Sequence, residues 1–289
     1  VLAYFEMFQR DIGRFQDCHH RTDVMPLGSG ALAGVAYQTD REFLAAELGF
    51  SRISANSMDA VSDRDFVVEF LAAASLCMMH FSRMSEELVL WSSSEFGFIR
   101  LADEFTTGSS IMPQKRNPDF AELARGKTGR VYGDLIGLLT TLKGLPLTYN
   151  RDLQEDKEGF FDAADTLTTT LDVFQAMLPG MKLNEERVSS LAGESQMLAT
   201  DLAASLVGKG RPFREAHGIM AAVTEYATAQ GKPFRDLTLE EYRRFSDQFD
   251  RGVFDITVDS SVAARDVPGG TAPARVEEAL ARARALLET

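Results

Sequence analysis

The residue types best suited to chemistry gather in one stretch, Gly108–Asp119, which reads GSSIMPQKRNPD. It carries two neighbouring serine hydroxyls and the adjacent cations of Lys115 and Arg116. Asn117 has the side chain of a helix N-cap, and Pro118 suits the first helical position. The stretch therefore predicts a flexible loop that leads into a helix N-terminus. There, unpaired backbone N–H groups and two cations would bind a carboxylate and stabilise negative charge that develops during a reaction.

Long helices are expected to position this loop. Apolar residues at helical spacing predict the end of a helix over residues 1–18, and three long helices after it. The first begins at a Ser62 cap and runs through Trp91, the second begins at Asn117 and ends at Lys143, and the third spans 156–178. Short connections between long helices predict an up-and-down bundle. No strand pattern is evident over residues 1–180, and His80, one residue off the apolar stripe of its helix, is expected on the helix flank.

The pattern changes after residue 180, where the helical segments become shorter and glycine and proline more frequent. The run from Thr238 to Glu241 predicts a capping box, and residues 272–288 predict a final helix. The fold class is therefore all-α, with two domains. We expect residues 1–185 to form a central bundle domain that lacks its N-terminal part, because Val1 falls in mid-helix, and residues 186–289 to form a smaller helical C-terminal domain.

Composition excludes several classes of function. The formal net charge of −13 over 289 residues argues against nucleic-acid and anionic-membrane partners. The longest apolar run, residues 70–79, is too short to span a membrane. Two cysteines make no disulfide framework, which fits a reducing cytoplasm. His19, His20 and Asp23 lack the spacing of metal ligands, so no metal site is expected.

The stretch Gly108–Asp119 matches every fixed position of the signature of the fumarase/aspartase lyase superfamily, Gly-Ser-Ser-x-Met-Pro-x-Lys-x-Asn-Pro. Residues 56–65 and 142–158 resemble in particular its argininosuccinate lyase branch, which includes the lens protein delta-crystallin. The resemblance implies β-elimination of argininosuccinate to arginine and fumarate, without a metal or organic cofactor. It also implies a homotetramer in which different subunits share each active site.

The resemblance assigns roles to particular residues. Ser109 aligns with the catalytic serine, as acid or as base, and would need help from Lys115 and from backbone donors. Glu122 aligns with the glutamate that orients a catalytic histidine, which in the family lies upstream of Val1. The residues expected to bind substrate are Asn117, Tyr149, Arg151, Gln154, Lys157 and, with the weakest case, Arg64.

Two functional classes remain open at this point. One is a carbon–nitrogen lyase, and the other is a non-catalytic structural relative of the delta-crystallin type. Adenylosuccinate lyase and fumarase share the serine loop, whereas the segment from Tyr149 to Lys157 favours argininosuccinate as the substrate. Since the partner histidine is not in this chain, the 289 residues alone are expected to be inactive.

Overall fold

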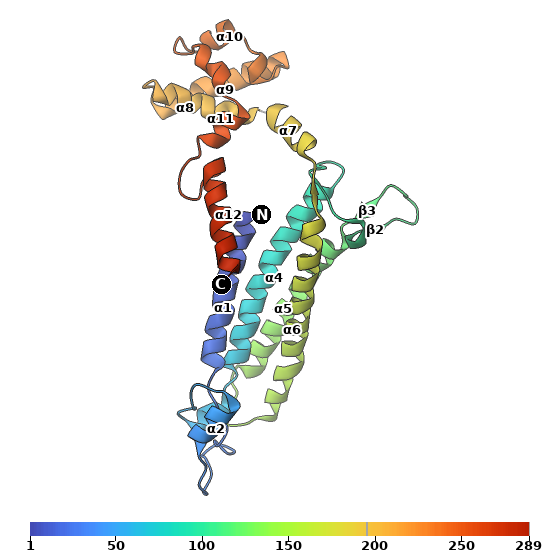
Figure 1. The fold of residues 1–289 in the computed structure, drawn as a ribbon, viewed down its shortest axis with the longest axis vertical. Coiled ribbons are helices and arrows are strands. Elements are labelled where there is room, and N and C mark those ends of the chain that lie inside the picture. The colour runs from blue at the N-terminus through green and yellow to red at the C-terminus, as the bar shows by residue number, and fades with distance from the viewer. Residues whose placement is uncertain (195, 289) are drawn as a thin grey trace. The chain divides into compact units, whose positions relative to one another are not determined.

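The structure, a computed structural model, describes residues 1–194 and 196–288 (Figure 1). These residues are mostly helical, and the predicted all-α class is confirmed. They divide into two compact units, one ending at Leu183 and the other beginning at Asn184. That the units are independent domains stays a prediction.

The first unit is a bundle of long helices that lie side by side (Figure 1). They are α1 (Leu2–Thr22), α4 (Asp65–Ser92), α5 (Asp119–Leu142) and α6 (Asp156–Met177). The central helix α4 packs against both α5 and α6. Apolar side chains from all four helices form one continuous core, which includes Tyr4, Met78, Phe81, Val131 and Phe174. The predicted up-and-down bundle is therefore confirmed.

Short elements connect the long helices. Two short helices, α2 (Arg41–Leu48) and α3 (Ser57–Ser62), lie between α1 and α4. Two-residue strands form two antiparallel pairs, which the strand-free prediction missed: β1 (Ile99–Arg100) with β4 (Lys182–Leu183), and β2 (Thr107–Gly108) with β3 (Arg116–Asn117). The 3-10 helices of this unit are Asp103–Phe105, Arg151–Glu155 and Leu178–Gly180.

The second unit has its own apolar core, built around α8 and α9, which pack against each other. Its α-helices are α7 (Glu185–Glu194), α8 (Ala199–Gly208), α9 (Phe213–Gln230), α10 (Leu239–Arg243), α11 (Val258–Ala263) and α12 (Pro273–Leu287). Its 3-10 helices are Gln196–Leu198, Phe234–Asp236 and Arg251–Asp255. The helix expected over residues 272–288 is present as α12.

The predicted start of the longest helix was wrong. Ser62 is the last residue of α3, which Asn56 caps by accepting a hydrogen bond from the N–H of Asp59 at 3.0 Å. Helix α4 begins three residues later, at Asp65, whose N–H donates to the carboxylate of Asp63 at 2.7 Å. The sequence therefore contains two helices where one was expected, with a sharp turn between them.

His80, which was expected on the flank of its helix, is buried inside the bundle. His80 is 5% exposed, and its Nδ1 lies 2.6 Å from a carboxylate oxygen of Asp11, which is 2% exposed. The other oxygen of Asp11 accepts from Arg14 at 2.8 Å. Burial, reinforced by the charge of Asp11, raises the pKa of the nearby Cys77 thiol to about 12. Because Asp11 lies on α1 and His80 on α4, this polar cluster ties the two helices together inside the bundle.

Two apolar residues at the helical spacing of their helices are exposed, Ile12 on α1 and Leu171 on α6. On α6 the buried face includes Thr166 and Thr170. A helical threonine satisfies its own hydroxyl by donating to the carbonyl four residues earlier, as Thr170 does to Thr166 at 2.7 Å. The spacing of apolar residues alone therefore misses the two threonines of this face.

Helix α4 is the one helix, among the residues described, that is long and apolar enough to cross a membrane by length and composition. The apolar run 70–79 thus underestimated its apolar extent. Half of the apolar window is buried inside the protein. Since α4 is the central helix of the bundle core, packing against α5 and α6 accounts for its composition.

The predicted capping box at the start of α10 is confirmed. Thr238 accepts from the N–H of Glu241 at 3.2 Å, and the Glu241 carboxylate accepts from the N–H of Thr238 at 2.7 Å. The same carboxylate accepts from Lys232 at 3.0 Å and from the Tyr226 hydroxyl at 2.9 Å. The backbone donor, then these two side chains, lower the pKa of Glu241 to about 2.

Replacing Glu241 by glutamine should therefore destabilise the second unit in a pH-dependent way. A carboxylate whose folded pKa is lowered stabilises the fold above its unfolded pKa and loses that contribution as the pH falls. The difference in melting temperature between wild type and E241Q should be largest above about pH 4.5. It should decrease as the pH falls toward about 2. Thermal melts across this range measure it, with E240Q, at an exposed neighbour, as the matched control. A difference that does not change with pH would contradict this role.

Candidate active site

A short hairpin carries the serine loop. Strands β2 and β3 pair antiparallel, with Thr107 opposite Asn117 and Gly108 opposite Arg116. The loop of residues 109–115 closes this stem, and α5 begins two residues beyond it. A side chain at residue 108 would come within 3.3 Å of the Arg116 guanidinium. Glycine at this position therefore leaves room for the Arg116 side chain beside the strand pair.

The Ser109 hydroxyl has an unusual environment for a residue on a surface loop. Its Oγ accepts hydrogen bonds from the backbone N–H groups of Ile111, at 3.2 Å, and Met112, at 3.1 Å. The N–H of Lys115 donates to the Met112 carbonyl at 3.0 Å, which folds the loop back on itself. Two N–H donors on one oxygen stabilise negative charge there, so they make it easier for the hydroxyl to give up its proton.

The remaining loop residues are accessible. Lys115 is exposed, and within the described chain its ammonium forms no ion pair. Glu122 lies exposed in the first turn of α5. Asn117 was predicted to cap this helix, and that prediction was wrong: it belongs to β3, and the N-cap residue is Pro118, without a side-chain hydrogen bond. Because Pro118 is the N-cap residue and Asn117 lies in a strand, the Asn117 amide does not cap the helix. It is therefore available to a ligand.

The second candidate segment joins α5 to α6. Tyr149 is half exposed, and Arg151 and Gln154 are exposed on the 3-10 helix Arg151–Glu155. Thr148, just before them, has φ +72°, a left-handed conformation that is rare for a β-branched residue. Functional loops often store such strain. The segment thus presents a phenol, a guanidinium and an amide to solvent from a tightly turned backbone.

Asp156 links this segment to the start of α4. Its buried carboxylate forms ion pairs with the Lys157 ammonium, at 2.7 Å, and with the Arg64 guanidinium. Burial alone would raise the pKa of Asp156, but the hydrogen bonds from the two cations outweigh it and hold the pKa below its ordinary value. Arg64 also donates to the backbone carbonyl of Val61 at 3.4 Å. Arg64 therefore has structural partners, whereas the Lys157 side chain remains largely exposed.

The two candidate segments lie at opposite ends of the same helix (Figure 1). The serine loop precedes α5 and the segment from Tyr149 to Lys157 follows it. Helix α5 has 24 residues. At 1.5 Å per residue it separates the two segments by about 36 Å. One copy of the chain therefore cannot bring Ser109 and Lys157 to the same small molecule.

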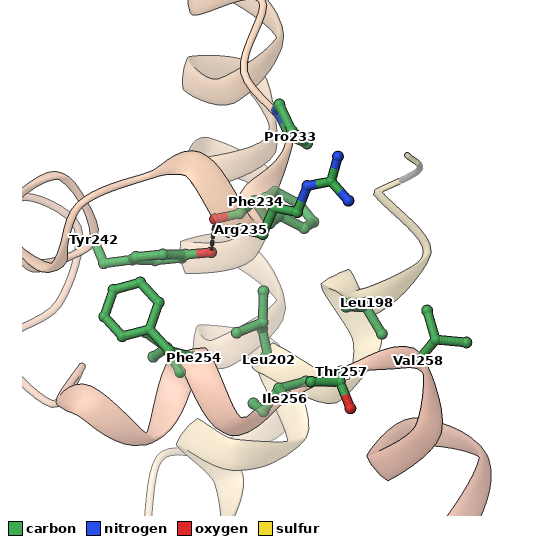
Figure 2. A pocket seen from close by; sticks show the side chains of 11 residues that line it. Leu198, Leu202, Pro233, Phe234, Arg235, Tyr242, Phe254, Ile256, Thr257 and Val258 are labelled. Carbon is green, nitrogen blue, oxygen red and sulfur yellow. Dashed lines mark hydrogen bonds between the residues drawn. The ribbon is translucent and has the colours of Figure 1, made fainter. Parts of the chain in front are cut away.

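Neither candidate segment lines the pocket of about 380 Å³ in the second unit (Figure 2). That pocket is mostly apolar, with Leu202, Tyr242, Phe254 and Ile256 around it and the Arg235 guanidinium near its edge. The Tyr242 hydroxyl donates to the Phe234 carbonyl at 2.9 Å and is thus already paired. Among the described residues no group of three or more His, Cys, Asp or Glu side chains could hold a metal ion.

Three residues with a part in this geometry were not found from the sequence. Asp156 was assigned no role from the sequence, although its position beside Lys157 could have suggested an ion pair. The hydroxyl of Thr107 donates to the carboxylate of Asp119 across the base of the hairpin. The spacing of Thr107 and Asp119 in the sequence does not predict this hydrogen bond. The two strands that bring these residues together are too short to show a periodic pattern.

Two family models match the chain. The model described as "Lyase" matches residues 1–133, which include the serine loop. The model described as "Argininosuccinate lyase C-terminal" matches residues 196–263, within the second unit.

The chain is also similar to argininosuccinate lyases of bacteria. It is 58% identical to that of Dehalococcoides mccartyi over 287 residues and 56% identical to that of Moorella thermoacetica over 288 residues. Each comparison covers 99% of this chain and 62% of the relative. The chain thus spans less than two thirds of the length of these relatives.

Solved structures of two lyases have a fold similar to that of this chain. An EDDS lyase variant with bound fumarate superimposes with a TM-score of 0.88 at 27% identity, over 99% of this chain and 59% of that one. The class II fumarase of Schistosoma mansoni, 17% identical, shows the fold alone, with a TM-score of 0.74 over 89% of this chain and 56% of that one. The long-helix bundle and its serine loop define the fumarase/aspartase superfamily of lyases. Within that superfamily, the chain is similar over 99% of its length to argininosuccinate lyases.

Proposed function

We propose that the protein containing this chain catalyses the β-elimination of argininosuccinate to arginine and fumarate. The observation that carries the proposal is the Ser109 oxygen, which accepts two backbone N–H groups in a loop that also presents Lys115 and Asn117. The family relationship supports the same reaction. The proposed substrate is a small molecule, and no cofactor is required by the scheme.

Ser109 acts as the base in this scheme. Its hydroxyl first gives its proton to solvent, so that the oxygen is negatively charged, and the oxygen then removes a proton from the succinyl carbon next to a carboxylate. Backbone donors on that oxygen stabilise the charged form without needing to reorganise during the reaction. They therefore favour the role of base over that of acid, a choice that the sequence left open.

The other residues bind charge. Removal of the proton leaves extra negative charge on the carboxylate, which Lys115 and the Asn117 amide stabilise. The electron pair then forms the carbon–carbon double bond of fumarate and the carbon–nitrogen bond breaks. The departing nitrogen takes a proton from an acid, which the family resemblance identifies as a histidine oriented by Glu122. Tyr149, Arg151, Gln154 and Lys157 bind the rest of the substrate, with Arg64 supporting Lys157 through Asp156.

We further propose a homotetramer in which each active site combines segments of different subunits. The separation of about 36 Å along α5 supports sharing between subunits, because one copy cannot bring Ser109 and Lys157 to the same substrate. Helix α5 also exposes large apolar side chains along its length, including Leu123, Ile136 and Leu139. Burying such a surface against other copies of α5 would stabilise an assembly. We propose a cytoplasmic location for this assembly, in line with an acidic biosynthetic enzyme.

A comparison of substrates tests the proposed function. The full-length protein is supplied in turn with argininosuccinate, adenylosuccinate and malate, and fumarate release is followed by its ultraviolet absorbance. We expect argininosuccinate to have a far higher kcat/KM than the other two. A preference for adenylosuccinate or malate would reassign the substrate, and failure to act on any of the three would favour a non-catalytic role.

A further inference from the structure

We propose that Thr107 and Asp119 are positioning residues, which form a latch at the base of the serine loop and hold it in its reactive shape. The inference rests on the proposed function, since it concerns the loop that carries Ser109. It arises from one contact: the Thr107 hydroxyl donates to the Asp119 carboxylate, between the strand that enters the loop and the helix that leaves it.

The latch lies where it can control the loop. Thr107 is opposite Asn117 in the hairpin, and Ser109 follows two residues after Thr107. Asp119 is the first residue of α5, two residues beyond Asn117. The hydrogen bond therefore joins the two ends of the loop from outside the strand pair. Opposed residues of an antiparallel pair lie about 5 Å apart. Closing the stem therefore also limits the distance between Ser109 and Asn117.

The hairpin has little else to hold it closed. Each strand is only two residues long, and an isolated short hairpin is marginal in water. On the side of the bundle, Phe105 and Phe120 stack edge to face with ring centres 5.6 Å apart, and both rings pack against the bundle core. These rings fix the outer end of the stem to the bundle. The latch is the next contact toward the loop, where the aromatic anchor no longer reaches.

The position and the hydrogen bond of the Asp119 carboxylate support its role in the latch. A carboxylate in the first turn of a helix is stabilised by the positive end of the helix dipole through its position alone. The N-cap residue Pro118 provides no side-chain acceptor for the unpaired N–H groups of α5. Asp119 accepts from Thr107 nonetheless, so its carboxylate serves the hairpin while it remains at the helix N-terminus. A hydrogen bond to a charged acceptor is also stronger than one between neutral groups.

The latch predicts a specific set of kinetic effects in the full-length protein. T107V keeps the β-branched shape but removes the donor, and D119A removes the acceptor. Each should lower kcat by about tenfold, the scale of one net hydrogen bond to a charged group. The double variant should be no slower than either single variant, because both remove the same contact. D119N keeps an acceptor oxygen and should lose less than D119A.

Trypsin supplies a readout that does not depend on activity. Lys115 and Arg116 are cleavage sites within or next to the loop, and an open latch should expose them. T107V should be cut there faster than wild type, while its melting temperature stays unchanged because the bundle core is intact. T106V is the matched control, since the neighbouring Thr106 hydroxyl donates to the Asp103 carbonyl at 3.2 Å and does not touch Asp119.

The outcomes separate the latch from the proposed function. If wild type releases fumarate and T107V matches it in both rate and cleavage, the latch is wrong. Losses that multiply in the double variant would also overturn it, because they would show two independent roles. If wild type acts on none of the substrates, the proposed function fails, and the cleavage rates of T107V and T106V still test the latch.

Discussion

Replacing Ser109 by alanine should reduce kcat by roughly a hundredfold or more, the scale of general acid–base catalysis. The Ser109 oxygen is the group that takes the proton in the proposed scheme, and two N–H donors prepare it for that task. Substrate affinity should change little, because in the proposed scheme Lys115 and Asn117 supply the charge and the amide that bind the carboxylate. Steady-state kinetics of the full-length variant measure both quantities.

Ser110→Ala is the matched comparison. The two serines are neighbours in one loop, but no backbone N–H among the residues described donates to the Ser110 hydroxyl. S110A should therefore show a much smaller loss of kcat than S109A. Turnover of S109A within a few-fold of wild type would remove Ser109 from the mechanism, even if S110A proved to be slow.

Two inactive variants should restore each other's activity when they assemble together. The serine loop and the segment from Tyr149 to Lys157 lie at opposite ends of α5, so the proposed active site draws them from different subunits. In a hybrid of S109A and K157M chains, some sites combine an intact loop from one chain with an intact segment from the other. Co-expression of the two chains with different tags, followed by purification on both, isolates these hybrids. Their fumarate release should far exceed that of either parent assembly.

The matched control combines S109A with K115M. Both changes lie in the same loop, so every site of that hybrid keeps one defect and should remain inactive. Equal inactivity of the S109A and K157M hybrid would show instead that the two segments do not meet in a shared site. Light scattering on each hybrid verifies that the expected tetramer has formed.

Some of this architecture could be predicted from the sequence, because long helices have a strong apolar period. On α5 the apolar residues Ala121, Val131 and Leu138 recur at helical spacing, and all three are buried. The serine loop was found through its fixed residues, and the capping box at Thr238 through its spacing. Each of these signals is local, so a single stretch of sequence contains all the information that it needs.

The features that were missed depend on contacts between distant residues. Asp11 and His80 are separated by 69 positions, and neither residue has a local feature that names its partner. Asn117 has the side chain of a good N-cap, yet pairing with Thr107 draws it into a strand and leaves Pro118 at the cap. Tertiary pairing therefore overrode a correct local preference at the loop that carries Ser109.

The most direct test is to count the products formed from argininosuccinate. The full-length protein, assembled as purified, is incubated with argininosuccinate, and arginine and fumarate are quantified by chromatography over time. The proposed reaction predicts that both accumulate in equal amounts and that S109A forms almost none of either. If the wild-type assembly consumes no argininosuccinate, or releases one product without the other, the proposed carbon–nitrogen lyase activity is contradicted.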